Sequence, residues 1–227
     1  LPLPAREQHP QALSHTTKGQ LSSSAYEGVT QLDISDLAVF SGLAEQKLAG
    51  LLQLKADGRT EFLSGGFDLT VDGKASRLKT ENPALNGLLQ GETSLSGRAA
   101  RGEKGIEFER LRLGNNQFET TLNGRFATGS SDLQAQARIY NLSSITDEAS
   151  GPLALDLSAK GKDSAHDLEA RVSLSSGDLR NRPVENLIAR LVGKLDKEQL
   201  AGRIDGSGQF NKAPFKLAGQ MSYNLTS

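Results

Sequence analysis

The heptapeptide FDLTVDG, residues 67–73, alternates apolar and polar side chains without a break. In an extended chain, Phe67, Leu69 and Val71 project to one side, and the polar residues between them project to the other. A period of two residues is typical of a strand that has one buried face and one solvated face. The heptapeptide therefore predicts a half-buried β-strand, and similar segments follow it along the chain.

The same alternation recurs in six further segments, around residues 117–127, 132–140, 153–160, 168–175, 200–210 and 215–223. Roughly ten to twelve strands are expected in all. Gly, Asn and Asp favour turns, and we expect turns at Asp57-Gly58, Asp72-Gly73, Asn115-Asn116 and Gly129-Ser130-Ser131. Residues 184–195 fit both a helix face and a strand, and periodicity alone favours a helix.

Two features of the apolar positions are unusual for a β protein. Leu occurs 35 times, and Val and Ile occur 6 times each, although β-branched residues usually dominate strands. Glycine also takes apolar positions inside the predicted strands, at Gly97, Gly124, Gly202, Gly206 and Gly219. Interior glycines mark bends, bulges or close approaches of another backbone. We therefore expect a strongly curved sheet with a soft, leucine-lined face.

Helical signals are few. Asn82, Pro83 and Gly91 provide an N-cap, a first-turn proline and a stop around a short apolar stripe, which predicts one short helix. A second short helical turn is expected within residues 36–44. The sequence thus predicts an all-β fold with at most three short helices.

Composition argues against several classes of function. The 26 Lys+Arg balance 27 Asp+Glu, whereas a nucleic-acid-binding domain needs a basic face. The chain has no Cys, and its 3 His lack the spacing of a helical zinc site. The motifs of serine hydrolases and phosphate-binding loops are missing as well. We predict no enzymatic activity, no cofactor, no metal and no nucleic-acid partner.

Several short motifs occur in order along the chain: LDISDLA at 32–38, FSGL at 40–43, LAG at 48–50, FDLTVDG at 67–73, NPAL at 82–85 and GETSLSG at 91–97. Together they resemble the TamB family, the periplasmic subunits of the translocation and assembly module within the wider AsmA-like proteins, and the resemblance extends from Leu32 to about Met221. The resemblance implies a β-taco, in which a long sheet folds lengthwise around a hydrophobic groove. It also favours a strand at 184–195.

The same resemblance suggests how the chain is organised. Residues 1–31 match poorly and are expected to be β, and residues 32–227 form the family-like segment, with a possible turn boundary near 150–152. The chain begins at Leu1 and carries neither end of the longer family members. We therefore interpret it as a middle segment of a protein anchored in the inner membrane and lying in the periplasm of a Gram-negative bacterium.

The family resemblance implies a hydrophobic groove for phospholipid transfer, outer-membrane protein assembly, or both, between the two membranes. The implied partners are phospholipid acyl chains and, through parts of the longer protein, a TamA-type outer-membrane barrel. The residues expected to line the groove are large apolar residues of the alternating segments: Leu52, Leu54, Phe67, Leu69, Val71, Leu95, Phe118, Leu122, Phe126, Leu133, Ile139, Leu153, Leu155, Leu157, Leu168, Val172, Leu174, Ile204, Phe210, Phe215, Leu217 and Met221.

An alternative interpretation needs no lipid. Without the resemblance, an alternating face more often fills a closed core than lines a conduit. The chain would then be a structural or binding β-module, such as an adhesin or a carbohydrate-binding repeat. The absence of Trp and the small number of Tyr, 3, disfavour carbohydrate binding, because sugars stack on exposed aromatic rings.

Overall fold

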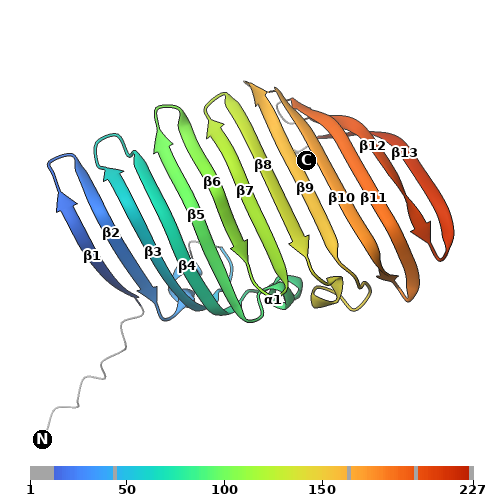
Figure 1. The fold of residues 1–227 in the computed structure, drawn as a ribbon, viewed down its shortest axis with the longest axis horizontal. Helices are drawn as coiled ribbons and strands as arrows, with labels where there is room; N and C mark the ends of the chain where they lie inside the picture. Colours follow the sequence, from blue (N-terminus) through green and yellow to red (C-terminus); the bar gives the residue numbers. More distant parts are fainter. Residues whose placement is uncertain (1–12, 43–44, 163–164, 197–198, 225–227) are drawn as a thin grey trace, which may run out of the picture.

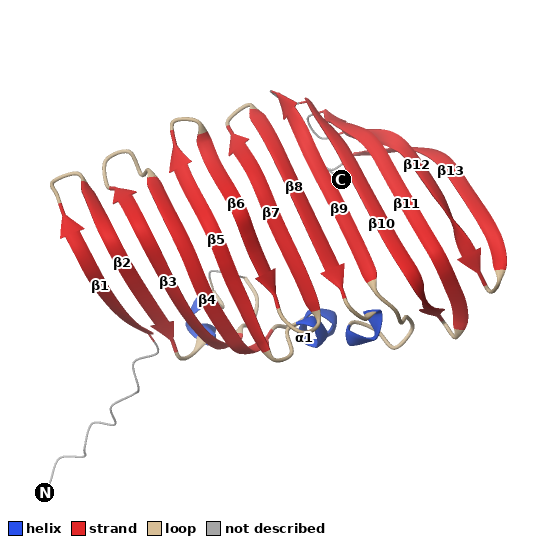
Figure 2. Ribbon diagram, viewed as in Figure 1, coloured by secondary structure: helices blue, strands red, loops and turns tan. Residues whose placement is uncertain are grey.

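A single antiparallel sheet of 13 strands makes up most of the protein in a computed structural model that describes residues 13–42, 45–162, 165–196 and 199–224 (Figures 1 and 2). Each strand pairs with its neighbours in sequence, so the sheet is a meander whose edges are β1 and β13. The sheet is open, and the predicted all-β, curved fold is confirmed. Its strands are β1 (Leu13–Leu21), β2 (Ala25–Ile34), β3 (Ala49–Glu61), β4 (Phe67–Lys79), β5 (Glu92–Gly102), β6 (Gly105–Gly114), β7 (Phe118–Ala127), β8 (Ser130–Ile139), β9 (Leu153–Lys162), β10 (Ala165–Leu179), β11 (Arg182–Asp196), β12 (Gln199–Phe210) and β13 (Ala213–Asn224).

Residues 184–195 belong to strand β11, so the helix that periodicity favours there is wrong. β11 pairs along its length with β10 on one side and with β12 on the other. These pairings join segments that local periodicity cannot relate to one another. The sheet also continues across residues 150–152, because β9 pairs with both β8 and β10. Residues 1–12, part of the segment expected to be β, lie outside the described residues.

Two of the predicted turns are also wrong. Asp57-Gly58 lies inside β3 and Asp72-Gly73 lies inside β4, where both glycines keep their places in the strand pairing. The alternation of apolar and polar positions runs through each pair, so the strands continue instead of turning. The turn at Asn115-Asn116 is confirmed, because these residues lie in the short connection that follows β6. The turn predicted at Gly129-Ser130-Ser131 is confirmed only at Gly129, because Ser130 and Ser131 already belong to β8.

Three β-bulges bend the sheet. At each of them the strand pairing skips, and a residue with left-handed backbone lies in the bulge: Arg77 with a φ of 55°, Arg110 with 46° and Asn186 with 51°. A bulge adds one residue to one strand of a pair, which kinks that strand and increases its local twist. The curvature expected from the interior glycines therefore has a second source in these bulges.

The short helices all lie at one end of the sheet, at the lower ends of the strands in Figure 2. They are η1 (Leu37–Phe40), α1 (Pro83–Leu88) and η2 (Leu142–Ser144). As predicted, α1 begins with Pro83 after the N-cap Asn82, whose side chain accepts hydrogen bonds from two backbone N–H groups. At the other end of the sheet, shorter turns join the strands.

The best-buried part of the protein lies largely where these helices meet the sheet. Among the described residues, the apolar side chains that are buried are Ala25, Ile34, Phe118, Leu174 and Val184. The side chain of Asn115 joins α1 to the sheet, because its Nδ2 donates to Leu88 O at 2.8 Å and to Thr93 Oγ1 at 3.0 Å. This buried set is much smaller than the core that a chain of this length usually has. Most of the described apolar side chains are therefore only partly covered.

Candidate functional site

The strand pairing divides the sheet into one apolar face and one polar face. Residues paired across antiparallel strands project to the same side, so a row can be followed from strand to strand. One such row runs through nine neighbouring strands: Leu95, Leu113, Thr120, Ala137, Leu155, Val172, Ala189, Gly206 and Leu217. Rows of this kind define a surface, here called the apolar face, that extends from β1 to β13.

Every residue that the sequence predicted to line the groove lies on this face. Leu52 and Leu54, for example, pair with Ala75 and Gly73 of β4, and Gly73 pairs in turn with Leu95 of β5. Following the register through all the strands places the whole predicted set on the same side as Leu95, from Leu52 in β3 to Met221 in β13. The structure therefore brings together residues that lie far apart in the sequence.

The sequence analysis missed the contribution of β6 to the apolar face. Ile106 and Phe108 alternate with polar residues, but the bulge at Arg110 shifts the alternation by one position before Leu111 and Leu113. These four side chains lie on the apolar face because they pair with β7 residues of that face. The signal that would have identified this strand is the pair Ile106 and Phe108 followed, after two polar residues instead of one, by the pair Leu111 and Leu113. Such a change of phase is typical of a strand with a bulge.

Much of the apolar face is open to solvent. Phe126 is 53% exposed and Leu217 is 55% exposed, while most residues near the middle of the face are half-buried. Within the described residues every strand belongs to this one sheet, and no second sheet packs over the face. Large contiguous apolar surfaces are rare on monomeric proteins and usually mark a binding site.

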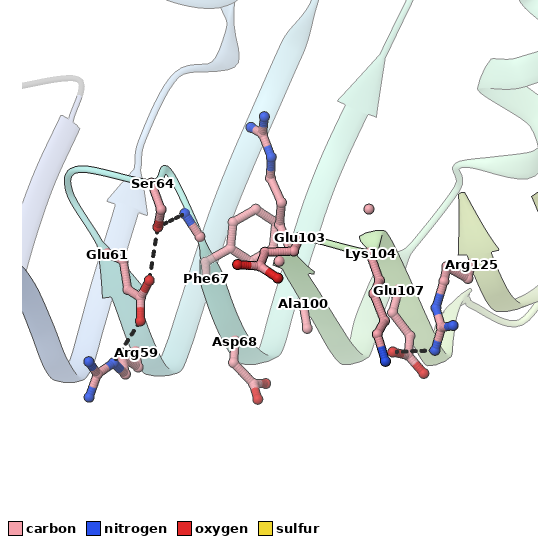
Figure 3. Close-up of a pocket in the computed structure, with 14 residues that line it drawn as sticks. Arg59, Glu61, Ser64, Phe67, Asp68, Ala100, Glu103, Lys104, Glu107 and Arg125 are labelled. Atoms are coloured by element: carbon pink, nitrogen blue, oxygen red, sulfur yellow. Dashed lines mark hydrogen bonds and ion pairs between the residues drawn. The ribbon is translucent and has the colours of Figure 1, made fainter. Parts of the chain in front are cut away.

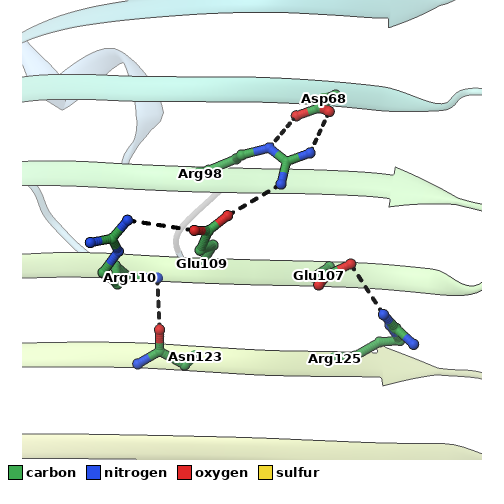
Figure 4. A network of polar contacts seen from close by, with 7 residues as sticks. All are labelled: Asp68, Arg98, Glu107, Glu109, Arg110, Asn123 and Arg125. Atoms are coloured by element: carbon green, nitrogen blue, oxygen red, sulfur yellow. Dashed lines mark hydrogen bonds and ion pairs between the residues drawn. The ribbon is translucent and has the colours of Figure 1, made fainter.

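The opposite, polar face carries rows of paired charges. Arg98 of β5 lies between Asp68 of β4 and Glu109 of β6, and its guanidinium donates to Asp68 Oδ1 at 2.6 Å and to Glu109 Oε2 at 3.2 Å (Figure 4). On the next pair of strands, Arg125 reaches Glu107 at 3.3 Å. These pairs are exposed and individually contribute little to stability. Together they make this face water-compatible.

Arg98 also controls the titration of its neighbour. Its hydrogen bonds hold the pKa of the Asp68 carboxyl below the usual value of 3.8, because they favour the ionised form. Because ionised Asp68 is favoured in the folded state, it stabilises the fold. This stabilisation is fully present above the usual pKa of 3.8, and it is lost as the pH falls through the lowered pKa of Asp68 in the folded protein.

We expect Arg98→Gln to raise the pKa of Asp68 towards 3.8 and to lower stability only slightly at neutral pH, because the pair is exposed. In acid, once Asp68 is protonated, the stabilities of the variant and the parent should converge. NMR titration of the Asp68 carboxyl measures the shift, with Arg112→Gln as a control that removes an arginine paired with Glu119 instead. An unchanged Asp68 pKa in Arg98→Gln would contradict this account.

A cavity of about 710 Å³ lies at the end of the sheet that carries the shorter turns, and mainly charged side chains line it (Figure 3). These side chains engage one another: Arg59 reaches Glu61 at 3.4 Å, and Ser64 donates to the same carboxylate at 2.8 Å. No described group of three or more His, Asp and Glu is arranged to bind a metal ion. The charges of the cavity thus engage one another as they do on the rest of the polar surface.

None of the described helices has the length and apolar character needed to cross a membrane. Comparison of the chain with protein-family models, curated proteins and solved structures finds no match. The resemblance to the TamB family therefore depends on the sequence motifs alone. The most distinctive feature of the structure is the uncovered apolar face.

Proposed function

We propose that the protein is a periplasmic, TamB-like segment whose apolar face forms a hydrophobic groove for phospholipid acyl chains between the inner and outer membranes. The observation that supports this is the continuity of the apolar face across 13 strands without a covering sheet. At about 4.8 Å between strands, the face runs for about 58 Å along the sheet. This length exceeds the thickness of the hydrocarbon core of a bilayer, about 30 Å.

The chemistry of the face suits an acyl chain. Covering the face with hydrocarbon gains about 0.8 kcal/mol for each buried methylene, and Leu side chains with small residues such as Ala137 and Gly206 between them impose no polar specificity. The paired charges of the polar face keep the outside of the sheet in water. A sheet with these two faces can shield lipid from the aqueous periplasm.

The family resemblance suggests two extensions of this proposal. The same face could hold the apolar residues of outer-membrane proteins during their assembly, since these also need cover between the membranes. A TamA-type outer-membrane barrel would be the partner at one end, through parts of a longer protein. Both extensions depend on the resemblance, while the lipid groove also depends on the geometry of the sheet.

The proposal predicts that lipid contacts only one side of the sheet. Photo-crosslinking residues placed at Leu69, Leu122 and Leu155 on the apolar face should capture phospholipid in cells. Crosslinkers at the neighbouring residues should not, because Asp68, Thr121 and Asp156 project to the polar face. Mass spectrometry of the captured products identifies the lipid.

Each of these pairs differs by a single position in one strand, so expression level and local environment are matched. Equal labelling on the two faces would overturn the lipid groove. Capture of an outer-membrane protein instead of phospholipid would favour the extension to protein assembly. No capture on the apolar face, with the fold intact, would favour the structural or binding β-module.

A further inference from the structure

One part of the apolar face is hollowed into an open cavity. A cavity of about 550 Å³ lies where β9 to β13 end near η2, and almost all of its wall is apolar. Two of its residues, Leu174 and Val184, are 6% and 7% exposed, in contrast to Leu217 nearby on the open face at 55%. The lining comprises Leu142, Ala149, Leu153, Leu174, Asp178, Leu179, Val184, Leu187, Phe210, Ala213, Pro214 and Phe215.

The loop that precedes β9 forms one wall, and backbone bonds hold it in place. Ala149 forms a β-bridge with Leu179, and on either side of it Ser150 N donates to Asp178 O at 2.9 Å and Arg180 N donates to Glu148 O at 2.7 Å. Leu142 N donates to Gly151 O at 2.9 Å, which brings η2 and the Leu142 side chain back to the cavity. Backbone hydrogen bonds thus fix this wall of the cavity in the fold.

The cavity continues into the open apolar face. Leu153, Leu187 and Phe215 line it, and along each strand the next residue on the same face, two positions away, is Leu155, Ala189 or Leu217. An occupant longer than the cavity would thus extend from it onto the face. A long, flexible hydrocarbon chain has this shape, whereas a compact ligand would fill the cavity alone. Its volume lies within the range of small-molecule sites, about 300–1,000 Å³.

Two basic residues, Arg182 and Lys212, lie beside the cavity. The Arg182 guanidinium lies 5.9 Å from the centre of the Phe210 ring, which itself lines the cavity, and Lys212 lies in the turn between Phe210 and Ala213. Within the described part of the chain neither side chain forms an ion pair with an acidic residue. Of the acidic side chains nearby, Glu148 pairs with Arg180 at 3.0 Å, and Asp178, which lines the cavity, accepts from Ser150 Oγ at 3.2 Å.

We propose that this cavity binds one acyl chain of an anionic phospholipid, whose headgroup phosphate lies against Arg182 and Lys212. The inference rests on the proposed lipid groove and adds to it a discrete site at one end of the face. Apolar walls favour the chain, and two cations beside them favour an anionic headgroup, as expected of a site for an amphiphile. A lipid that enters or leaves the groove at this end would have its acyl chain in the cavity and its headgroup beside Arg182 and Lys212.

Dihexanoyl phosphatidylglycerol, titrated into the protein below its critical micelle concentration, tests the site by NMR of the leucine and valine methyl groups. The methyl groups of Leu142 and Val184 should shift. Ala213→Trp places a large ring at an exposed position of the cavity wall and should weaken this binding at least tenfold. Ala218→Trp is the matched control, because Ala218 is an exposed alanine of the same strand on the polar face, and it should bind as the parent does.

The headgroup contacts are tested separately. Arg182→Gln and Lys212→Gln should each weaken binding of phosphatidylglycerol about two- to fivefold, the range of exposed charge pairs, and more at low salt. Lys216→Gln removes the same charge from the polar face of β13 and should have no effect. Dihexanoyl phosphatidylcholine, whose choline offsets the charge of its phosphate, should bind the parent more weakly than phosphatidylglycerol does and should lose less affinity in the two charge variants.

The outcomes separate this site from the groove itself. Methyl shifts spread evenly over the apolar face, unchanged by Ala213→Trp, would overturn the discrete site and leave the groove intact. Equal binding of both phospholipids by the parent and the charge variants would overturn the headgroup assignment. If neither phospholipid shifts any methyl group on the apolar face, the proposed function falls together with the site.

Discussion

Replacing Leu122 or Leu155 by Arg is expected to reduce phospholipid transfer about 100-fold while the sheet stays folded. Both residues lie in the middle of the apolar face, on β7 and β9, and both are half-buried. A chain that passes along the face must cross these positions. The expected loss of transfer is therefore large although neither residue belongs to the buried end of the protein.

The magnitude follows from the cost of a charge in hydrocarbon. An arginine at the centre of a bilayer costs about 2.5–3.5 kcal/mol on insertion scales, and about 1.4 kcal/mol corresponds to a factor of ten. In the lipid-free protein the same side chain can lie along the apolar face and place its guanidinium in water. The folded state then loses only part of the burial of one leucine, about 1 kcal/mol.

Two measurements on each variant check this expectation: the rate of lipid transfer between donor and acceptor vesicles, and the denaturation midpoint. Gln134→Arg is the matched control, because Gln134 is exposed on the polar face of β8, and it should change neither quantity. Unfolding of both leucine variants would indicate a sealed core, where an unpaired charge costs about 4 kcal/mol or more. Full transfer by both would exclude these positions from the lipid path.

The faces of the strands could be predicted from the sequence because the signal is local. In segments such as 67–73 and 153–160 the polarity of each residue indicates the face of the sheet on which its side chain lies. The predicted groove residues therefore all belong to one face. The short helix α1 was predictable for the same reason, since Asn82 and Pro83 adjoin its first turn.

The errors arise where the structure depends on distant residues. Residues 184–195 have a pattern that fits two structures, and only pairing with β10 and β12 makes them a strand. Asp57-Gly58 has the composition of a turn, yet its neighbours on β2 and β4 keep it extended. The apolar cavity could not be predicted at all, because Leu142, Val184 and Phe215 come from three separate elements.

The glycines of the apolar face are not equivalent, although the sequence shows them in the same pattern. Gly124 of β7 has a φ of +119°, and a Cβ built on it would lie 1.9 Å from the backbone oxygen of Asp132 in β8. Gly219 of β13 has no such strain, and the nearest atom to its Cβ would be a methyl carbon of Ile204 at 3.7 Å. A side chain is therefore excluded at the first position and accommodated at the second.

Gly124→Ala is accordingly expected to destabilise the protein by about 3–5 kcal/mol, because alanine disfavours this backbone conformation and its Cβ would push β8 away. Gly219→Ala should be neutral or should stabilise the protein by up to about 1 kcal/mol, since alanine lowers the entropy of the unfolded chain. Urea denaturation of the two variants measures both effects on the same scale.

This pair also separates two roles for glycine on a lipid-facing surface. If the glycines served only to widen the groove, both substitutions would leave stability unchanged and reduce lipid binding slightly. The structure instead makes Gly124 a requirement for the pairing of β7 with β8, so its loss should disrupt the rows of side chains that cross the middle of the face. Equal stability of the two variants would contradict that role and would leave the bulges at Arg77, Arg110 and Asn186 as the source of the curvature.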